Sequence, residues 1–233
     1  RIEKTFTSVN FNMMIMVIYA LITIAIFGMW YYARYEGNFL PSPKKTFNPM
    51  MLVAIVILVP GTQFAANFIA NLTGYIRPDW MQQYNELFET SGITDTTFVT
   101  VLYSVILAPI CEELIFRGVT MRCARKALPF ALANLMQAAL FGLFHLNWIQ
   151  GIYAFALGIV LGYVCERGGS IYYSMGLHLL FNLWGTLSGF FPDPGNSVVV
   201  FVIVIAVTIV SLVVGFVLFN KGRRKLPINS TGI

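Results

Sequence analysis

The chain has 233 residues, of which 58% are hydrophobic and only 11% are charged, and its formal net charge at pH 7 is +5. Soluble domains carry about 25% charged residues, so this composition excludes an ordinary soluble domain and predicts a membrane protein. The basic residues fall in short segments between apolar runs and near the C-terminus, a pattern that sets membrane topology, and we expect no nucleic-acid partner.

Seven apolar runs approach the length of about 20 residues that a membrane-spanning helix needs. They cover approximately residues 9–32, 50–73, 97–121, 129–146, 149–165, 169–190 and 197–219. The predicted fold class is all-α, a polytopic membrane helix bundle of seven transmembrane helices, or eight if a span precedes Arg1, with the site inside the bundle. We expect 1–233 to form a single membrane-embedded domain with its catalytic core at about 97–190.

Two local features interrupt this pattern early in the chain. The Pro60-Gly61 step lies inside the second run and predicts a kink, which is tolerated where neighbouring helices satisfy the freed backbone groups. Residues 77–96 are rich in acidic and aromatic side chains and are compatible with a short interfacial helix.

Lysine and arginine predict the orientation. They follow the first, third, fifth and last runs, whereas the alternate loops carry almost none, which places the basic loops and the C-terminus in the cytoplasm of a multi-pass cell-membrane protein. These residues are Arg34, Lys44, Lys45, Arg122, Arg125, Lys126, Arg167, Lys221, Arg223, Arg224 and Lys225.

Two adjacent glutamates, Glu112 and Glu113, lie in the third apolar run, and Arg117 follows one helical turn later. A charged side chain near the bilayer centre costs at least about 2.5–3.5 kcal/mol, so it persists where it is paired, solvated or functional. Glu113 and Arg117 are spaced i,i+4 with the acid first, which predicts a structural ion pair. Glu112 is rotated by about 100° and is expected to face the bundle interior.

Later helices supply polar partners at a similar depth. A rise of about 1.5 Å per residue places Glu112, His145, His178 and Asn182 within about one helical turn of each other across the membrane. His178 and Asn182 share one helix face, as do Phe141 and His145, and Phe141 is a candidate substrate contact.

This set of groups predicts hydrolysis of a peptide bond. A carboxylate and an imidazole that converge on a water molecule act as general base and acid, and donors such as His178 and Asn182 stabilise an oxyanion. We expect no cofactor. Zinc held by Glu112, His145 and His178 is the alternative, although the sequence lacks the HExxH spacing. We interpret Asn134 and Gln137 as interhelical hydrogen-bonding groups, and Gly158 and Gly162 as positions of close helix packing.

Three motifs in this order resemble a known family. CEELIFRGV contains EExxxR (Glu112, Glu113, Arg117), FGLFH contains FxxxH (Phe141, His145), and HLLFN contains HxxxN (His178, Asn182). Over roughly residues 97–190 the chain resembles the CPBP family of CAAX proteases and bacteriocin-processing enzymes, also called Abi, which includes the type II CAAX prenyl endopeptidases. It looks more like a bacterial than a eukaryotic member.

The resemblance implies a glutamate-type intramembrane endopeptidase, a hydrolase acting on a membrane-associated peptide or protein that is lipidated in some relatives. It implies that Glu112 and His145 activate water, that His178 and Asn182 form an oxyanion hole, and that Glu113 and Arg117 are structural. CAAX processing, peptide-pheromone maturation and bacteriocin processing are the activities it suggests. The alternative is a non-catalytic membrane scaffold, an immunity protein or a regulator of a membrane sensor kinase. A transporter is a weaker option, because the chain has no internal repeat.

Overall fold

The computed structural model describes residues 8–36, 47–91, 97–188 and 197–223, and within these ranges every regular element is a helix. In chain order they are α1 (Ser8–Tyr31), η1 (Tyr32–Glu36), α3 (Pro49–Ile76), α4 (Pro78–Ser91), α5 (Phe98–Val101), η2 (Leu102–Leu107), α6 (Ala108–Glu113), η3 (Leu114–Met121), α7 (Arg122–Arg125), α8 (Phe130–Phe144), α9 (Trp148–Gly168), α10 (Ile171–Ser188) and α11 (Val198–Arg223). The elements labelled η are π-helical, and α5 to α7 form one uninterrupted helical run.

Each predicted apolar run coincides with a helix, but a count of seven spans is not confirmed. Within the described residues, five helical runs are long and apolar enough to cross a membrane: Met13–Arg34, Pro49–Ile76, Phe98–Arg125, Trp148–Gly168 and Val198–Arg223. The apolar helix α8 has 15 residues, so it extends about 22 Å against a hydrocarbon core of about 30 Å. The helix α10 has 18 residues but interrupts its apolar sequence with His178 and Asn182.

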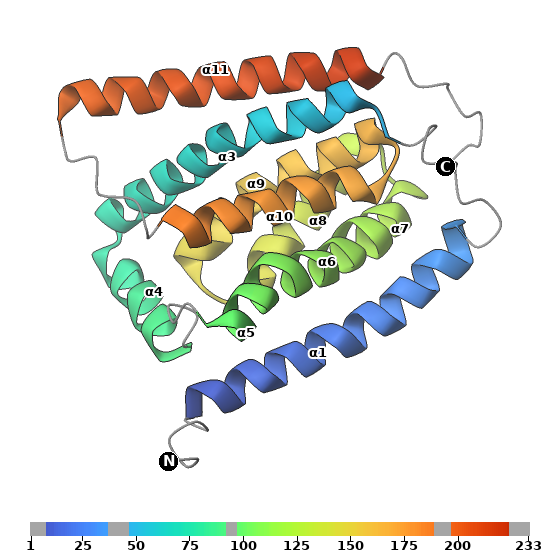
Figure 1. Cartoon of the computed structure of the whole chain (residues 1–233), viewed down its shortest axis with the longest axis horizontal. Coiled ribbons are helices and arrows are strands. Elements are labelled where there is room, and N and C mark those ends of the chain that lie inside the picture. The colour runs from blue at the N-terminus through green and yellow to red at the C-terminus, as the bar shows by residue number, and fades with distance from the viewer. Residues whose placement is uncertain (1–7, 37–46, 92–96, 189–196, 224–233) are drawn as a thin grey trace.

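Figure 1 shows how the helices are arranged, with α3 beside α11, α1 along the outside of the bundle and α4 at one end. The largest cluster of buried side chains joins α3, α9, α10 and α11 through residues such as Leu58, Leu161, Leu177 and Phe219. The predicted short helix between residues 77 and 96 is present as α4, while residues 92–96 lie outside the described part.

Polar residues at the helix ends fix where helices begin and stop. The Asn48 side chain accepts a hydrogen bond from Met50 N at 2.9 Å and caps α3. The Asn147 side chain likewise accepts from Gln150 N at 3.0 Å and starts α9 only three residues after α8 ends. Gly169 ends α9 at a φ of 66°, a left-handed conformation that favours glycine.

At the Pro60-Gly61 step, a neighbouring helix supplies hydrogen-bond partners for the backbone of α3. The Ser211 hydroxyl on α11 accepts a hydrogen bond from Gly61 N at 2.8 Å and donates to the Ile57 carbonyl, so it is inserted into the backbone ladder of α3. A Cβ atom on Gly61 would lie 2.7 Å from the Ser211 oxygen, which explains the glycine. The contact confirms that a neighbouring helix satisfies the backbone beside Pro60.

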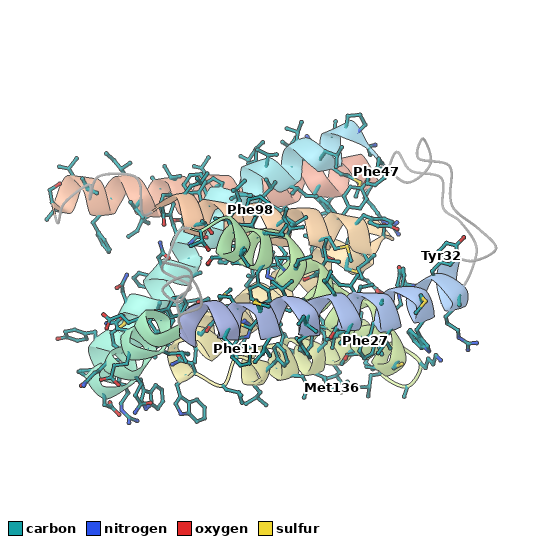
Figure 2. All side chains as sticks on the ribbon, turned by 60° about the horizontal axis from the view of Figure 1, so that its bottom comes forward. Phe11, Phe27, Tyr32, Phe47, Phe98 and Met136 are labelled. Carbon is teal, nitrogen blue, oxygen red and sulfur yellow. The ribbon has the colours of Figure 1, made fainter. Side chains whose placement is uncertain are left out.

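The outer surface of the bundle is apolar. Large apolar side chains are exposed along α1, α8 and α11, among them Phe11, Met136 and Phe201, and Figure 2 shows the side chains around the bundle. An apolar surface of this extent is typical of a protein that contacts lipid. Together with the five span-length helices, it identifies a membrane protein.

Candidate active site

The two glutamates lie on α6, a short α-helical segment between the π-helical segments η2 and η3. A π-turn closes its backbone hydrogen bond over one more residue than an α-turn, and such turns are frequent at functional sites. Side chains that follow a π-turn are therefore rotated relative to their positions in a regular helix. The sequence-based prediction assumed regular helical geometry and missed both segments.

Asn182 satisfies a backbone carbonyl that this irregular helix leaves open. The backbone N–H of Ala108 bonds to the Tyr103 carbonyl, five residues back, so it does not serve Ser104. The next residue, Pro109, has no N–H to donate. The Asn182 amide nitrogen fills the gap by donating to the Ser104 carbonyl at 2.8 Å. One of the two N–H groups of this amide is therefore engaged in backbone support.

Glu113 and Arg117 form the predicted ion pair. The Arg117 Nη1 atom donates to Glu113 Oε1 at 2.8 Å, and both side chains are 0% exposed. Arg117 Nη2 also donates to the Gly158 carbonyl at 3.2 Å, and the guanidinium lies 4.6 Å from the centre of the Phe141 ring. Pairing, a hydrogen bond and the aromatic face together compensate the burial of the charge.

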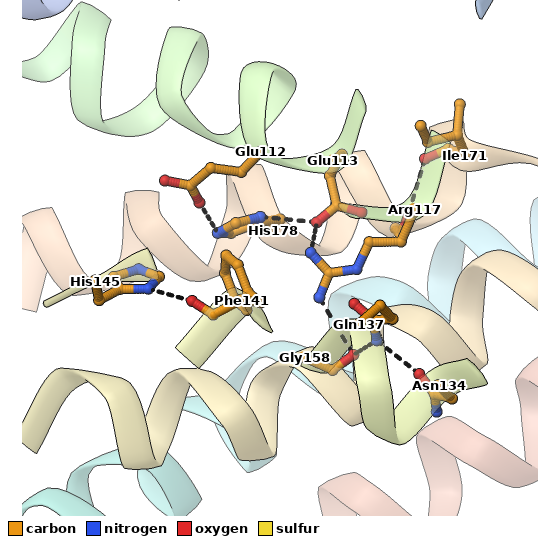
Figure 3. Close-up of polar contacts among 11 residues, drawn as sticks. Glu112, Glu113, Arg117, Asn134, Gln137, Phe141, His145, Gly158, Ile171 and His178 are labelled. Carbon is orange, nitrogen blue, oxygen red and sulfur yellow. Dashed lines mark hydrogen bonds and ion pairs between the residues drawn. The ribbon is translucent and has the colours of Figure 1, made fainter. Parts of the chain in front are cut away.

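His178 lies between the two glutamates (Figure 3). Its Nδ1 atom is 3.0 Å from Glu113 Oε1, and its Nε2 atom is 3.6 Å from Glu112 Oε2. A carboxylate paired with arginine can only accept a hydrogen bond, so Nδ1 carries a proton and Nε2 faces Glu112. The Glu112–His178 pair is then charge-balanced either as carboxylate with imidazolium or as carboxylic acid with neutral imidazole.

His145 stands at the end of α8, where it is the C-cap residue. Its Nδ1 atom is 2.8 Å from the Phe141 carbonyl oxygen, which makes Nδ1 the donor and leaves Nε2 as the available nitrogen. The Phe141 ring contacts both imidazoles, with centroid distances of 4.9 Å to His145 and 5.7 Å to His178. Phe141 thus lies against both histidines.

The structure brings most of the predicted site residues together, but in two groups. Glu112 and Glu113 meet His178, while His145 is held by Phe141, and these described side chains include no hydrogen bond or ion pair between Glu112 and His145. Asn182 bonds to Ser104 instead of sharing a partner with His178. Within the described ranges, no three His, Cys, Asp or Glu side chains are placed to hold one metal ion.

A second polar cluster lies next to Arg117, between α8 and α9. Asn134 donates to the Ile159 carbonyl at 3.0 Å, and Gln137 donates to the Gly158 carbonyl at 2.9 Å. These contacts between α8 and α9 confirm the prediction of interhelical hydrogen bonding. We call Arg117, Asn134, Gln137 and the Gly158 carbonyl the polar floor of the site.

Two contacts in this region were not predicted from the sequence. The first, Glu113 with His178, requires knowledge of how α10 crosses the third helical run. The second, Asn182 with Ser104, has a partial signal in the sequence, because Pro109 lies five residues after Ser104.

Comparison with known proteins gives one match. Residues 94–184 match the family model described as Type II CAAX prenyl endopeptidase Rce1-like. No curated protein and no solved structure matches the chain. The matched range contains Glu112, Glu113, Arg117, Phe141, His145, His178 and Asn182.

Proposed function

We propose that this chain, whose residues 94–184 match the family model described as Type II CAAX prenyl endopeptidase Rce1-like, is an intramembrane endopeptidase that hydrolyses a peptide bond with a glutamate-activated water. The proposed substrate is a membrane-associated peptide or protein. We further propose that the protein lies in the cell membrane with its basic loops and C-terminus in the cytoplasm.

One observation carries the proposal: an imidazole is held between two carboxylates inside an apolar bundle. The side chain of His178 is 3% exposed, and those of Glu112 and Glu113 are 15% and 0% exposed. Because burying charged groups is costly, a purely structural role would be served by Glu113 and Arg117 alone. Glu112 adds a second acid that the ion pair does not need, beside a histidine that can exchange a proton with it.

In the proposed reaction, Glu112 is the general base. Its carboxylate takes a proton from a water molecule, whose oxygen forms a bond to the carbonyl carbon of the scissile peptide. The carbonyl π electrons move to the oxygen, which becomes an oxyanion. When the intermediate collapses, the carbon–nitrogen bond breaks and the leaving amine receives the proton that Glu112 took from water. The products are a carboxylic acid and an amine, and no covalent enzyme intermediate forms.

His178 and Asn182 are the proposed oxyanion donors. Glu113 holds Nδ1 of His178, so an imidazolium would direct its Nε2–H toward the reacting groups and balance the charge of Glu112. Asn182 retains one amide N–H beyond the one given to Ser104. Donors fixed before the reaction stabilise developing negative charge because they need no reorganisation.

His145 is proposed to act together with Glu112 in activating the water, with Phe141 as a substrate contact. In the present geometry, Nδ1 of His145 is bound by the Phe141 carbonyl, so Nε2 would be the atom that accepts a proton.

We propose that no metal takes part. Hydrolysis is then expected to persist in an excess of a zinc chelator, measured as cleavage by the purified protein in detergent. Loss of cleavage in chelator, with recovery on adding Zn²⁺, would assign a metal to Glu112, His145 and His178 instead.

The function and the substrate are tested together by comparing the peptides in membranes of cells that produce wild type or Glu112→Gln. We expect fragments that appear only with wild type, and their sequences distinguish a prenylated CAAX tail, a peptide pheromone and a bacteriocin precursor. Glu166→Gln is the matched control, because Glu166 pairs with Arg125 at 3.2 Å far from the site. A biological effect that persists in Glu112→Gln would support the non-catalytic alternative.

A further inference from the structure

Charged residues divide between the two ends of the bundle. At one end, which we call the basic end, lie Arg34, Arg122, Arg125, Lys126, Arg167, Lys221 and Arg223. Contacts tie these segments together: Arg125 pairs with Glu166, Asn48 bonds to the Gly222 carbonyl, and Arg223 lies over the turn at Gly169. The opposite end, the α4 end, carries the acids of α4 (Figure 1). Excess lysine and arginine mark the cytoplasmic side.

Toward the basic end, the site is closed. The polar floor lies on that side of His178 (Figure 3), and its side chains Arg117 and Gln137 are completely buried. Both donate to the Gly158 carbonyl and so join the third helical run, α8 and α9 at one point. Beside the polar floor, Leu114, Met121, Cys165 and Ile171 belong to a second cluster of buried residues.

Toward the α4 end, the polar side chains of the site are less buried. Among the described polar groups of the site, the partly exposed ones are Glu112, His145 and Asn182, whereas Glu113 and His178 are buried. His145 marks the point where α8 stops, about 22 Å from its start, so the helix ends below the full thickness of the hydrocarbon core. The next residue, Leu146, is 94% exposed.

The helix α4 flanks this less buried side of the site. Trp80 of α4 stacks on Trp148, three residues after His145, with ring centres 5.3 Å apart. Tyr84 of α4 approaches Tyr153 of α9 with their hydroxyl oxygens 3.5 Å apart. These contacts hold α4 beside the α8–α9 turn, at the end of the molecule where the described charged residues are the acids of α4 and Arg77, which pairs with Asp79.

We propose that substrate reaches this site from the α4 end, which the charge distribution assigns to the extracytoplasmic face of the membrane. The substrate class is then a peptide segment presented outside the cytoplasm, from an exported peptide or the external part of a membrane-anchored chain. That the site takes a substrate at all rests on the proposed function. The direction of access rests only on burial, on where the helices end and on the distribution of charge.

The native cysteines provide internal controls for a test of access by cysteine labelling. Cys123 is exposed at the basic end, whereas Cys111, beside Glu112, and Cys165 are buried. In a Cys123→Ser background, Leu146→Cys marks the mouth of the site and Asp79→Cys marks α4. A small membrane-impermeant thiosulfonate is added to intact cells or to permeabilised cells, and modification is read by mass. We expect both introduced cysteines to react fully in intact cells, and Cys123 of the wild type to react only after permeabilisation.

Glu112→Cys extends the test into the site itself. We expect it to react in intact cells, more slowly than Leu146→Cys, while the adjacent native Cys111 stays unmodified in the same protein. Reaction of Leu146→Cys or Glu112→Cys only after permeabilisation would overturn the proposal. So would a Glu112→Cys that stays unreactive from both sides while Leu146→Cys reacts.

Labelling does not require hydrolysis, so the two proposals fail separately. If Glu112→Gln leaves the membrane peptides unchanged while the labelling pattern holds, the enzymatic proposal fails and the direction of access stands. If a variant is not produced in folded form, the other marker at the same end answers the same question, because Asp79 is an exposed residue whose pair with Arg77 contributes little.

Discussion

His178 contacts both of the adjacent glutamates, Glu112 through Nε2 and Glu113 through Nδ1. Glu113 binds Arg117 on one side and Nδ1 of His178 on the other, so it supports the fold and also orients the imidazole. The sequence indicated only the first of these roles. A residue that orients another group is distinguished from a purely structural one by separating activity from stability.

Replacing Glu113 with Gln is expected to lower the free energy of unfolding by about 3–5 kcal/mol, because Arg117 is left as an uncompensated buried charge. Thermal unfolding of the detergent-purified protein measures this change. The double variant Glu113→Gln/Arg117→Met removes both charges and is expected to recover much of the stability. Activity is not expected to recover, because His178 still lacks an anionic partner at Nδ1. Full activity in the double variant would show that Glu113 does not orient His178.

Asn182 has a backbone role that is separable from its proposed catalytic role. In Asn182→Ala the partly buried Ser104 carbonyl loses its donor, and we expect a loss of about 1–3 kcal/mol in the free energy of unfolding. Adding Pro109→Ala restores an N–H five residues after Ser104 and is expected to regain part of this stability. Cleavage is expected to stay low in the double variant. Equal unfolding midpoints for wild type and Asn182→Ala would contradict the backbone role.

At the scale of elements, the sequence predicted helices and missed their irregularities. Each of the seven apolar runs located a helical segment of the described ranges, and the i,i+4 spacing predicted the pair of Glu113 with Arg117. The π-helical segments on both sides of α6 could not be predicted in this way, because they depend on contacts with α10 as well as on Pro109. The helix α8 is short because Asn147, two residues after its C-cap His145, already begins α9 as the N-cap.

Close packing of α8 against α9 is expected to depend on Gly162. A Cβ atom there would overlap the Asn134 side chain, which also bonds to Gln137 and to the Ile159 carbonyl. We expect Gly162→Ala to destabilise the protein by about 1–3 kcal/mol, measured by thermal unfolding. Gly176→Ala is the matched control: no atom lies within 4 Å of its added methyl group, so alanine should be neutral or stabilising by up to about 1 kcal/mol. Equal losses in both variants would contradict this explanation.

At the scale of the whole molecule, the bundle combines long apolar helices with two that carry the histidines. The span-length helices provide a lipid-facing exterior, whereas α8 and α10 are shorter or more polar and lie at the site. Depth estimated from helix rise correctly brought residues of three helices to one region. It did not resolve which side chains touch, because that depends on how each helix is rotated within the bundle.

The most direct test of the central claim uses purified protein in liposomes. Its substrate is the peptide identified by comparing the membrane peptides of cells that produce wild type or Glu112→Gln. Wild type is expected to cleave it, and Glu112→Gln, which keeps the size of the side chain but cannot accept a proton, should be slower by about 10²–10⁴-fold. Glu166→Gln should match wild type. Cleavage by Glu112→Gln at the wild-type rate would contradict the account of Glu112 as the general base.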